Sequence, residues 1–261
     1  RCQMLLSSLD SGLLIGAASI LGTYCAILSL SGRIGQRNSH KGAVLAVREL
    51  NSDTFEVVCQ LDKQWQHTPG QFAFITFNRL EGPHPFTIAS ADQGDGQIRF
   101  AIKALGDYPR KLGQNIEIGQ QVTVEGPYGY FNLPEAQNNS RQIWVAAGIG
   151  ATPFIAWLEG LQNDPQAAPQ ASLYYCVNNE HEAVFAERLQ QLCTKLPSIE
   201  LHIHLSQRDG YLTPERLFEG ATKDTKVWFC GPSAFSDKLK QGMQQLGMQP
   251  DNFHHELFQM R

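Results

Sequence analysis

The residues best suited to hold a phosphate group lie at Gly148-Ile149-Gly150, which Thr152 and Pro153 follow closely. Glycines let the backbone turn tightly and approach a pyrophosphate without interference from a Cβ atom. Pro153 suits the first turn of a helix, whose free N–H groups and positive dipole end attract anions. Because Pro153 takes the place of the third glycine in G-x-G-x-x-G, a plain strand–turn–helix remains the alternative.

Polar side chains follow two later apolar segments that we expect to be strands. Asn178 comes after the second of these strands, where the ribose of a dinucleotide would lie, and its amide can bind ribose hydroxyls. Arg208 comes after the third strand. A 2′-phosphate would suit this arginine, and a solvated loop residue is an equally good interpretation.

The elements that must position these residues fall into two groups, of which the first is a series of short β-branched and aromatic segments. Gly, Pro, Asn and Asp separate the segments, a pattern typical of an antiparallel six-stranded β-barrel. We assign the barrel to residues 34–136. Its predicted strands are 43–50, 54–61, 71–77, 84–91, 97–105 and 121–126.

The second group alternates strands with helices, which predicts an α/β domain with a parallel sheet covered on both faces. We assign this nucleotide-binding domain to residues 137–261. Its predicted strands are 143–146, 173–177, 200–205 and 227–230, and its predicted helices are 153–161, 183–195 and 233–246.

Residues 12–31 form an uncharged, apolar segment of about the length that crosses a hydrocarbon core. Basic residues follow this segment and Asp10 precedes it, so the positive-inside tendency places everything after residue 33 on the cytoplasmic side of an inner or plasma membrane. We assign residues 1–33 to a single transmembrane helix, expected to be the last of a larger membrane domain. An apolar core helix is the alternative.

Composition argues against several other classes of protein. The net charge of −4 and the absence of a long basic block argue against a nucleic-acid partner. The six cysteines include no C-x-x-C pair, so we predict no metal site. His202 and His204 are interpreted as ordinary sheet residues. Glu56 and Glu182 are expected on solvent-exposed faces.

Three motifs, H-P-F-T at 84–87, G-x-G at 148–150 and C-G-P at 230–232, together resemble the ferredoxin–NADP reductase superfamily. Within it, the chain is most similar to the flavin- and nicotinamide-binding half of membrane ferric reductases and NADPH oxidases. The resemblance extends from about residue 40 to the C-terminus. It implies FAD and either NADPH or NADH as cofactors.

The resemblance also implies which barrel residues bind FAD. Phe86 would lie against the flavin or its ribityl chain, and Thr87 would offer a hydrogen bond near flavin N5. His84, preceding Pro85, would face the polar tail of FAD. A second segment would meet the FAD pyrophosphate, with Lys103, Gly106 and Tyr108 as the implied contacts.

In the second domain the resemblance places the Cys230 thiol beside nicotinamide C4, with Gly231-Pro232 completing the motif. Glu256 would help to seat the nicotinamide and the cysteine. Phe258 would cover the flavin ring and move aside for hydride transfer, with Met260 as the alternative covering residue. Thr87, Cys230, Glu256 and Phe258 are thus the implied catalytic residues.

The activity implied is that of an NAD(P)H:flavin oxidoreductase that takes a hydride and passes single electrons onward. In ferric reductases and NADPH oxidases the electrons cross the membrane through haem to ferric iron or oxygen, and such a haem would belong to a missing upstream membrane domain. A membrane-tethered diaphorase reducing a separate protein, a quinone or free flavin is one alternative. A truncated nucleotide-binding module without turnover is another. Arg208 and the resemblance favour NADPH over NADH.

Overall fold

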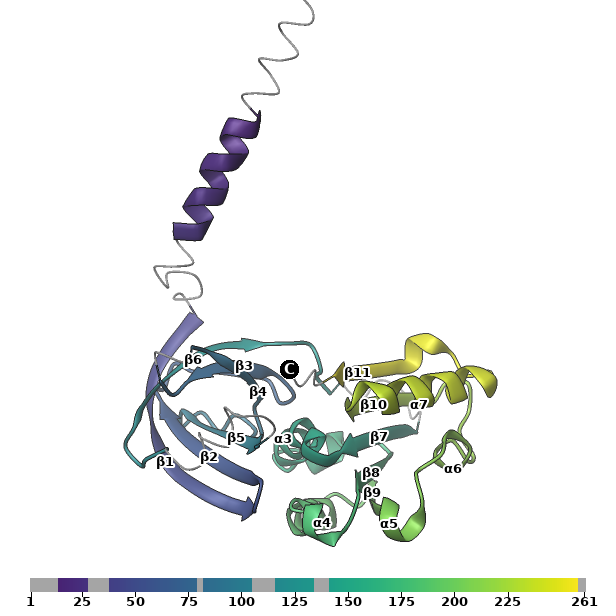
Figure 1. The fold of residues 1–261 in the computed structure, drawn as a ribbon. Coiled ribbons are helices and arrows are strands. Elements are labelled where there is room, and N and C mark those ends of the chain that lie inside the picture. The colour runs from purple at the N-terminus through teal and green to yellow at the C-terminus, as the bar shows by residue number, and fades with distance from the viewer. Residues whose placement is uncertain (1–13, 28–37, 79–81, 105–115, 134–140, 258–261) are drawn as a thin grey trace, which may run out of the picture. The chain divides into compact units, whose positions relative to one another are not determined.

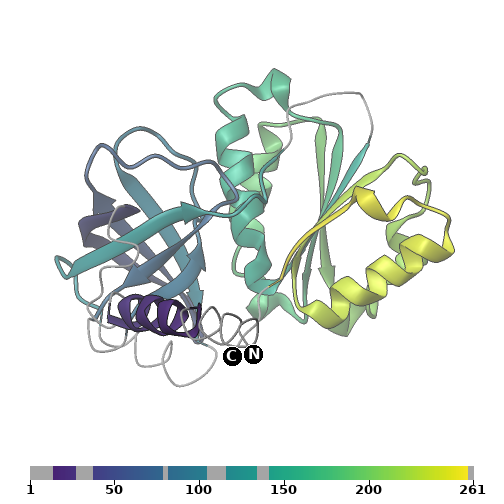
Figure 2. The same cartoon turned by 90° about the horizontal axis from the view of Figure 1, so that it is seen from above.

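The computed structural model describes residues 14–27, 38–78, 82–104, 116–133 and 141–257. The chain divides into two compact units, Arg1–Ser39 and His40–Arg261. The second unit contains two β-sheets of different kinds (Figures 1 and 2).

In the first unit, residues 14–27 form a helix on which large apolar side chains such as Leu14, Ile20 and Tyr24 are exposed. Within the described ranges, no helix combines the length and the apolar character needed to cross a membrane. The other residues of the predicted segment 12–31 lie outside those ranges, so the transmembrane helix stays a prediction.

The described residues of the second unit begin with a six-stranded sheet in the order β4-β3-β6-β1-β2-β5. A bridge between Ile88, directly after β4, and Phe100 of β5 joins the two outer strands and closes the sheet into a barrel. The antiparallel strand prediction is confirmed. The strands are β1 (Ser39–Asn51), β2 (Thr54–Leu61), β3 (Phe72–Thr76), β4 (His84–Thr87), β5 (Gln97–Lys103) and β6 (Gln121–Tyr128).

The parallel sheet has the order β11-β10-β7-β8-β9. Its strands are β7 (Gln142–Ala147), β8 (Ala171–Val177), β9 (Ile199–Leu205), β10 (Lys226–Gly231) and β11 (Phe253–Leu257). The helices are α3 (Thr152–Leu161), α4 (Ala186–Thr194), α5 (Ser206–Asp209), α6 (Pro214–Leu217) and α7 (Ser233–Gln245). Short 3₁₀ turns occupy η2 (Gly148–Ala151), η3 (Pro165–Ala167), η4 (Glu180–Glu182) and η5 (Pro250–Asn252).

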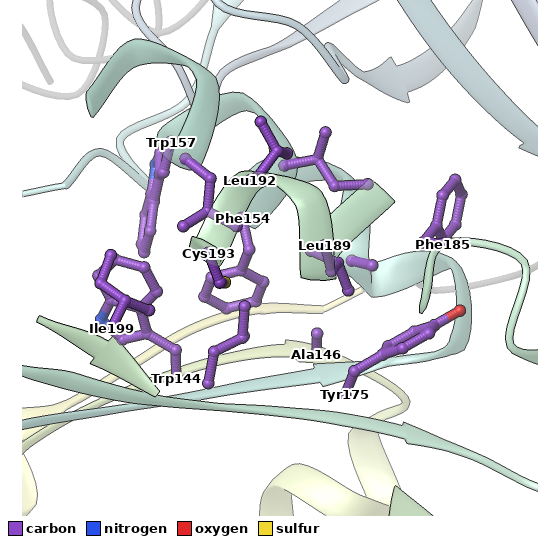
Figure 3. Close-up of a cluster of buried hydrophobic side chains, with 14 of the residues drawn as sticks. Trp144, Ala146, Phe154, Trp157, Tyr175, Phe185, Leu189, Leu192, Cys193 and Ile199 are labelled. Atoms are coloured by element: carbon purple, nitrogen blue, oxygen red, sulfur yellow. The ribbon is translucent and has the colours of Figure 1, made fainter. Parts of the chain in front are cut away.

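Apolar side chains cover both faces of the parallel sheet, as predicted. On one face α3 and α4 pack against β7 and β8, where the ring of Trp144 stacks on Phe154 with centroids 6.0 Å apart (Figure 3). On the other face Leu217 of α6 and Met243 of α7 join a second buried cluster around Phe229. Strand β11 was not among the predicted strands, and it adds a fifth, parallel member beside β10.

One prediction about charged side chains is wrong. Glu56 of β2 was expected to face solvent, and its side chain is only 5% exposed. Arg188 of α4, far away in sequence, donates a hydrogen bond to this buried carboxylate at 2.8 Å. A buried charge needs such a partner to offset the loss of water.

Candidate functional site

The strand order of the parallel sheet creates a crevice at one edge. β7 comes first in the chain, β8 and β9 are added on one side of it, and β10 and β11 on the other. The direction of winding therefore reverses between β7 and β10, and ligands of open α/β sheets bind outside the carboxyl ends of the strands at such a point. A cavity of about 520 Å³ lies there, lined by residues that follow β7, β8, β9 and β10.

Two glycines allow the end of β7 and the turn that follows it to lie close against the end of β10. A Cβ atom on Gly150 would lie 2.2 Å from the backbone oxygen of Cys230, and one on Gly231 would lie 2.6 Å from the Cβ of Ala147. Gly148, with φ +57°, lines the cavity and has open space around it. The turn therefore leaves space directly before α3, where the pyrophosphate of a dinucleotide fits.

The start of α3 is arranged as the sequence predicts. Pro153 occupies its first turn, and the buried Thr152 donates from Oγ1 to the backbone oxygen of Ile149 at 3.2 Å. Thr152 and Pro153 therefore shape the turn, and they are absent from the lining of the cavity itself.

Asn178 lines the cavity, as expected for a residue that binds a ribose. Its Nδ2 donates to both carboxylate oxygens of Glu182 at 3.1 Å, and its Oδ1 accepts from Ser206 Oγ at 3.1 Å. Glu182 was predicted to be solvent-exposed, which is wrong, because it follows β8 at the crevice and is half-buried there. A carboxylate beside an amide is well suited to accept hydrogen bonds from ribose hydroxyls.

Two lysines approach the same cavity from opposite parts of the chain. Lys103 ends β5 of the barrel and lies 3.6 Å from Asp53 Oδ2, and Lys238 lies on α7. The contact of Lys103 with the FAD pyrophosphate stays a prediction, and its position also suits a phosphate in the crevice. Lys238 and the exposed Tyr211 were not predicted as site residues. In the sequence, the signal that could have found them is position alone, because Tyr211 comes shortly after β9 and Lys238 shortly after β10.

Arg208 lies on a neighbouring cavity of about 400 Å³, together with Arg216 and His202. Its guanidinium donates to the adjacent Asp209 twice, from Nε at 2.8 Å and from Nη2 at 2.9 Å. This bidentate pair raises the pKa of Arg208 and lowers that of Asp209. The positive charge predicted to bind a 2′-phosphate is therefore already partnered.

Cys230 and Glu256 lie side by side, since β10 and β11 run parallel with these two residues in register. Cys230 is completely buried, and burial, followed by the charge of Glu256, raises the pKa of its thiol well above the usual value. Burial also raises the pKa of Glu256 to about 7. No described residue hydrogen-bonds Oε2 of this carboxylate. The pair provides a neutral thiol and a poorly solvated carboxyl group next to Gly231 and Pro232, which line the crevice.

The H-P-F-T segment forms β4, at one edge of the antiparallel sheet. His84 and Phe86 are half-buried, Pro85 is exposed, and Phe86 meets the ring of Phe100 at a centroid distance of 6.4 Å. Thr87 is buried, and its hydroxyl lacks a hydrogen-bond partner among the described residues. A buried hydroxyl without a partner is costly, so this atom is suited to bind a ligand such as the flavin.

Three predicted site residues, Gly106, Tyr108 and Phe258, lie outside the described residues, as does Met260. Their assigned roles stay predictions. In the part of the chain that is described, no group of three or more His, Cys, Asp or Glu side chains is placed to hold a metal ion.

Comparison with protein families matches residues 39–132 to an FAD-binding domain and residues 144–241 to an oxidoreductase NAD-binding domain. The chain belongs to the ferredoxin–NADP reductase superfamily. It is a flavin- and nicotinamide-binding oxidoreductase, with its flavin domain before its nucleotide domain. The unpartnered Thr87 hydroxyl and the glycine-lined crevice fit these two cofactors.

Curated relatives of this superfamily member include reductases of oxygenase systems. The toluate 1,2-dioxygenase electron transfer component of Pseudomonas putida is 26% identical over 85% of this chain and 68% of its own length. The carnitine monooxygenase reductase subunit of Escherichia coli K12 is 30% identical over 57% of this chain and 44% of its own length. The chain therefore spans only part of these relatives.

Two solved structures have the same fold. The FAD/NAD-binding domain of nitric oxide dioxygenase from Vibrio cholerae gives a TM-score of 0.71 at 19% identity, covering 84% of this chain and 98% of that domain. A ferredoxin–NADP⁺ reductase from Neisseria gonorrhoeae, with bound FAD and NADP, gives a TM-score of 0.73 at 18% identity. The match covers 84% of this chain and 98% of that one.

Proposed function

We propose that this superfamily member oxidises NAD(P)H and delivers the electrons singly to an acceptor. The observation that carries the proposal is the crevice at the reversal of the sheet. It is lined by Gly148 and by Gly231 and Pro232, which directly follow the buried Cys230. The neutral thiol beside this lining is suited to an uncharged or weakly charged ring rather than to a phosphate.

The residues of the chain would act by binding and orienting. Gly148 and Gly150 admit the pyrophosphate to the start of α3, and Asn178 holds a ribose. The buried Cys230 would lie beside the nicotinamide and help to keep water away from it, and Thr87 would offer its unpartnered hydroxyl to the flavin edge. When bound, FAD supplies the redox chemistry, because it accepts two electrons with the hydride and releases them one at a time. A fixed distance and orientation of the nicotinamide and flavin rings would account for much of the rate of hydride transfer.

For the acceptor, we propose a one-electron centre on a separate protein. Support comes from the two relatives described above, which are named as an electron transfer component and a reductase subunit of oxygenase systems. A haem in an upstream membrane domain, with ferric iron or oxygen as terminal acceptor, is the second candidate. The uncharged helix 14–27 with its exposed apolar side chains favours this second route.

Anaerobic stopped-flow mixing of the FAD-loaded protein with NADPH or NADH tests the proposed reaction. We expect either nucleotide to bleach the flavin absorbance, and the ratio of the two rates gives the preferred nucleotide. Dithionite provides the control, because it reduces flavin without binding in the nucleotide crevice. Bleaching by dithionite with none by either nucleotide would contradict the proposal and leave a binding module without turnover.

A further inference from the structure

Four charged side chains form a crossed network between the barrel and the parallel-sheet domain. The barrel contributes Glu56 of β2 and Arg99 of β5, and the other domain contributes Glu159 of α3 and Arg188 of α4. Arg99 Nη2 lies 2.9 Å from Glu159 Oε2, and Arg188 Nη1 lies 2.8 Å from Glu56 Oε2. Arg188 Nη2 also contacts Glu159. Each arginine therefore pairs with an acid of the opposite domain.

Glu159 accepts the most hydrogen bonds in this network. Besides the two arginines, its Oε2 accepts a hydrogen bond from the backbone N–H of Ala91 at 3.2 Å. Ala91 follows Thr87 by only four residues, so this bond joins α3 to the backbone just after the flavin-binding strand. Burial, followed by the charge of Arg188, lowers the pKa of Arg99. Without the Glu159 carboxylate, the two guanidinium groups would share Glu56 alone and repel one another more strongly.

The same surface of α3 makes two further close contacts with the barrel. Trp157 Nε1 donates to the backbone oxygen of Pro69 at 3.0 Å, and a Cβ atom on Gly160 would lie 3.2 Å from Pro69 Cγ. α3 thus lies between the barrel and the parallel sheet (Figures 1 and 2). It directly follows the turn η2, whose Gly148 and Ile149 line the nucleotide crevice, and its last turn carries Glu159 of the network.

We propose that the network of Glu56, Arg99, Glu159 and Arg188 positions the nucleotide domain against the flavin domain, with Glu159 as its central positioning residue. None of the four members of the network lines the nucleotide crevice. Its effect on the reaction would come through the separation of Cys230 and Thr87, which lie in different domains. A misplacement of about 1 Å can lower a rate by roughly a hundredfold. The inference rests on the proposed hydride transfer.

The test is Glu159→Gln in the full chain, which keeps the shape of the side chain and removes its charge. We expect NAD(P)H to reduce the flavin at least about tenfold more slowly at saturation, while KM for NAD(P)H changes less than about threefold. Reduction by dithionite should stay at the wild-type rate. Arg188→Lys provides a milder variant that keeps the charge and loses the two-carboxylate contact, and we expect an intermediate rate.

A second readout needs no nucleotide or turnover. Hydrogen exchange of the FAD-loaded protein should become faster in residues 88–91 and in α3 of Glu159→Gln. The matched control is Asp62→Asn, which breaks the 3.0 Å ion pair of His40 and Asp62 within the barrel and should change neither readout. Unchanged exchange at both segments would overturn the inference, as would an equal loss of reduction by dithionite and by NAD(P)H. If NAD(P)H fails to reduce the wild-type flavin, the proposed function fails, and exchange still tests the network.

Discussion

Cys230 combines complete burial with a position directly before Gly231 and Pro232, which line the nucleotide crevice. A hydroxyl in its place would be smaller and would need hydrogen bonds that this environment is poorly suited to supply. We expect Cys230→Ser to slow flavin reduction by NAD(P)H by at least about tenfold, measured by stopped-flow absorbance. Cys193→Ser, at a buried cysteine of α4 away from the crevice, is the control. Equal rates for the two variants would contradict a role for the Cys230 thiol.

Glu256 gives the protein a definite dependence of stability on pH. Burial raises its pKa from 4.5 to about 7 in the folded protein. Between these values the unfolded chain loses the proton and the folded chain keeps it, so stability falls as pH rises from 4.5 to 7 and then levels off. Glu256→Gln should remove this fall and be more stable above pH 7 by about 2–3 kcal/mol. Urea unfolding of both proteins from pH 5 to 8 measures the free energy of unfolding. If the difference between wild type and Glu256→Gln stays constant over this range, the titration of Glu256 is not its cause.

The pair of Arg208 and Asp209 bears on the choice between NADPH and NADH. If Arg208 binds a 2′-phosphate, Asp209 competes for the same guanidinium. Asp209→Asn should then raise the ratio of kcat/KM for NADPH over NADH several-fold, and Arg208→Ala should lower it. Steady-state assays with both nucleotides measure the ratio. If neither substitution changes it, Arg208 has no part in the discrimination.

At the scale of elements, the close approach of the turn η2 to the end of β10 depends on Gly150. An added Cβ would meet the Cys230 backbone oxygen at 2.2 Å, so the two strands would have to separate. We expect Gly150→Ala to lower the free energy of unfolding by about 1–3 kcal/mol and to abolish reduction by NAD(P)H. Gly94→Ala is the control, at a positive-φ turn with open space around it. If both variants lose reduction by NAD(P)H to a similar extent, the close approach of Gly150 to Cys230 is not the cause.

Regular elements could be predicted because their apolar periodicity is local. The predicted segment 54–61 coincides with β2, and the predicted helix 153–161 differs from α3 by one residue. β11 could not be found in this way, since its pairing depends on β10, and neither could the buried Glu56, whose partner Arg188 is far away in sequence. Within the site, the glycines and Asn178 follow strand ends and were predictable. The partnered state of Arg208 became evident only with the geometry of its neighbour Asp209.

At the scale of the whole molecule, we propose that residues 12–31 attach the chain to an inner or plasma membrane, with residues after 33 on the cytoplasmic side. The support is the uncharged helix 14–27 with its exposed apolar side chains. We expect the full chain to sediment with membranes and Leu21→Arg to shift toward the supernatant, because a charge in hydrocarbon is costly. Leu246→Arg, at an exposed apolar residue of the second unit, is the control. Identical sedimentation of all three proteins would contradict the proposal.

Strand β11 has a consequence for the order in which the site is assembled. It is the last described strand, it lies at the edge of its sheet, and it carries Glu256. During synthesis the N-terminal parts of a chain generally fold first, so the barrel can take up flavin while the ribosome is still adding α7. The thiol of Cys230 gains its acidic neighbour only at the end. In a growing chain, the pair of Cys230 and Glu256 would therefore be completed only after the barrel has formed.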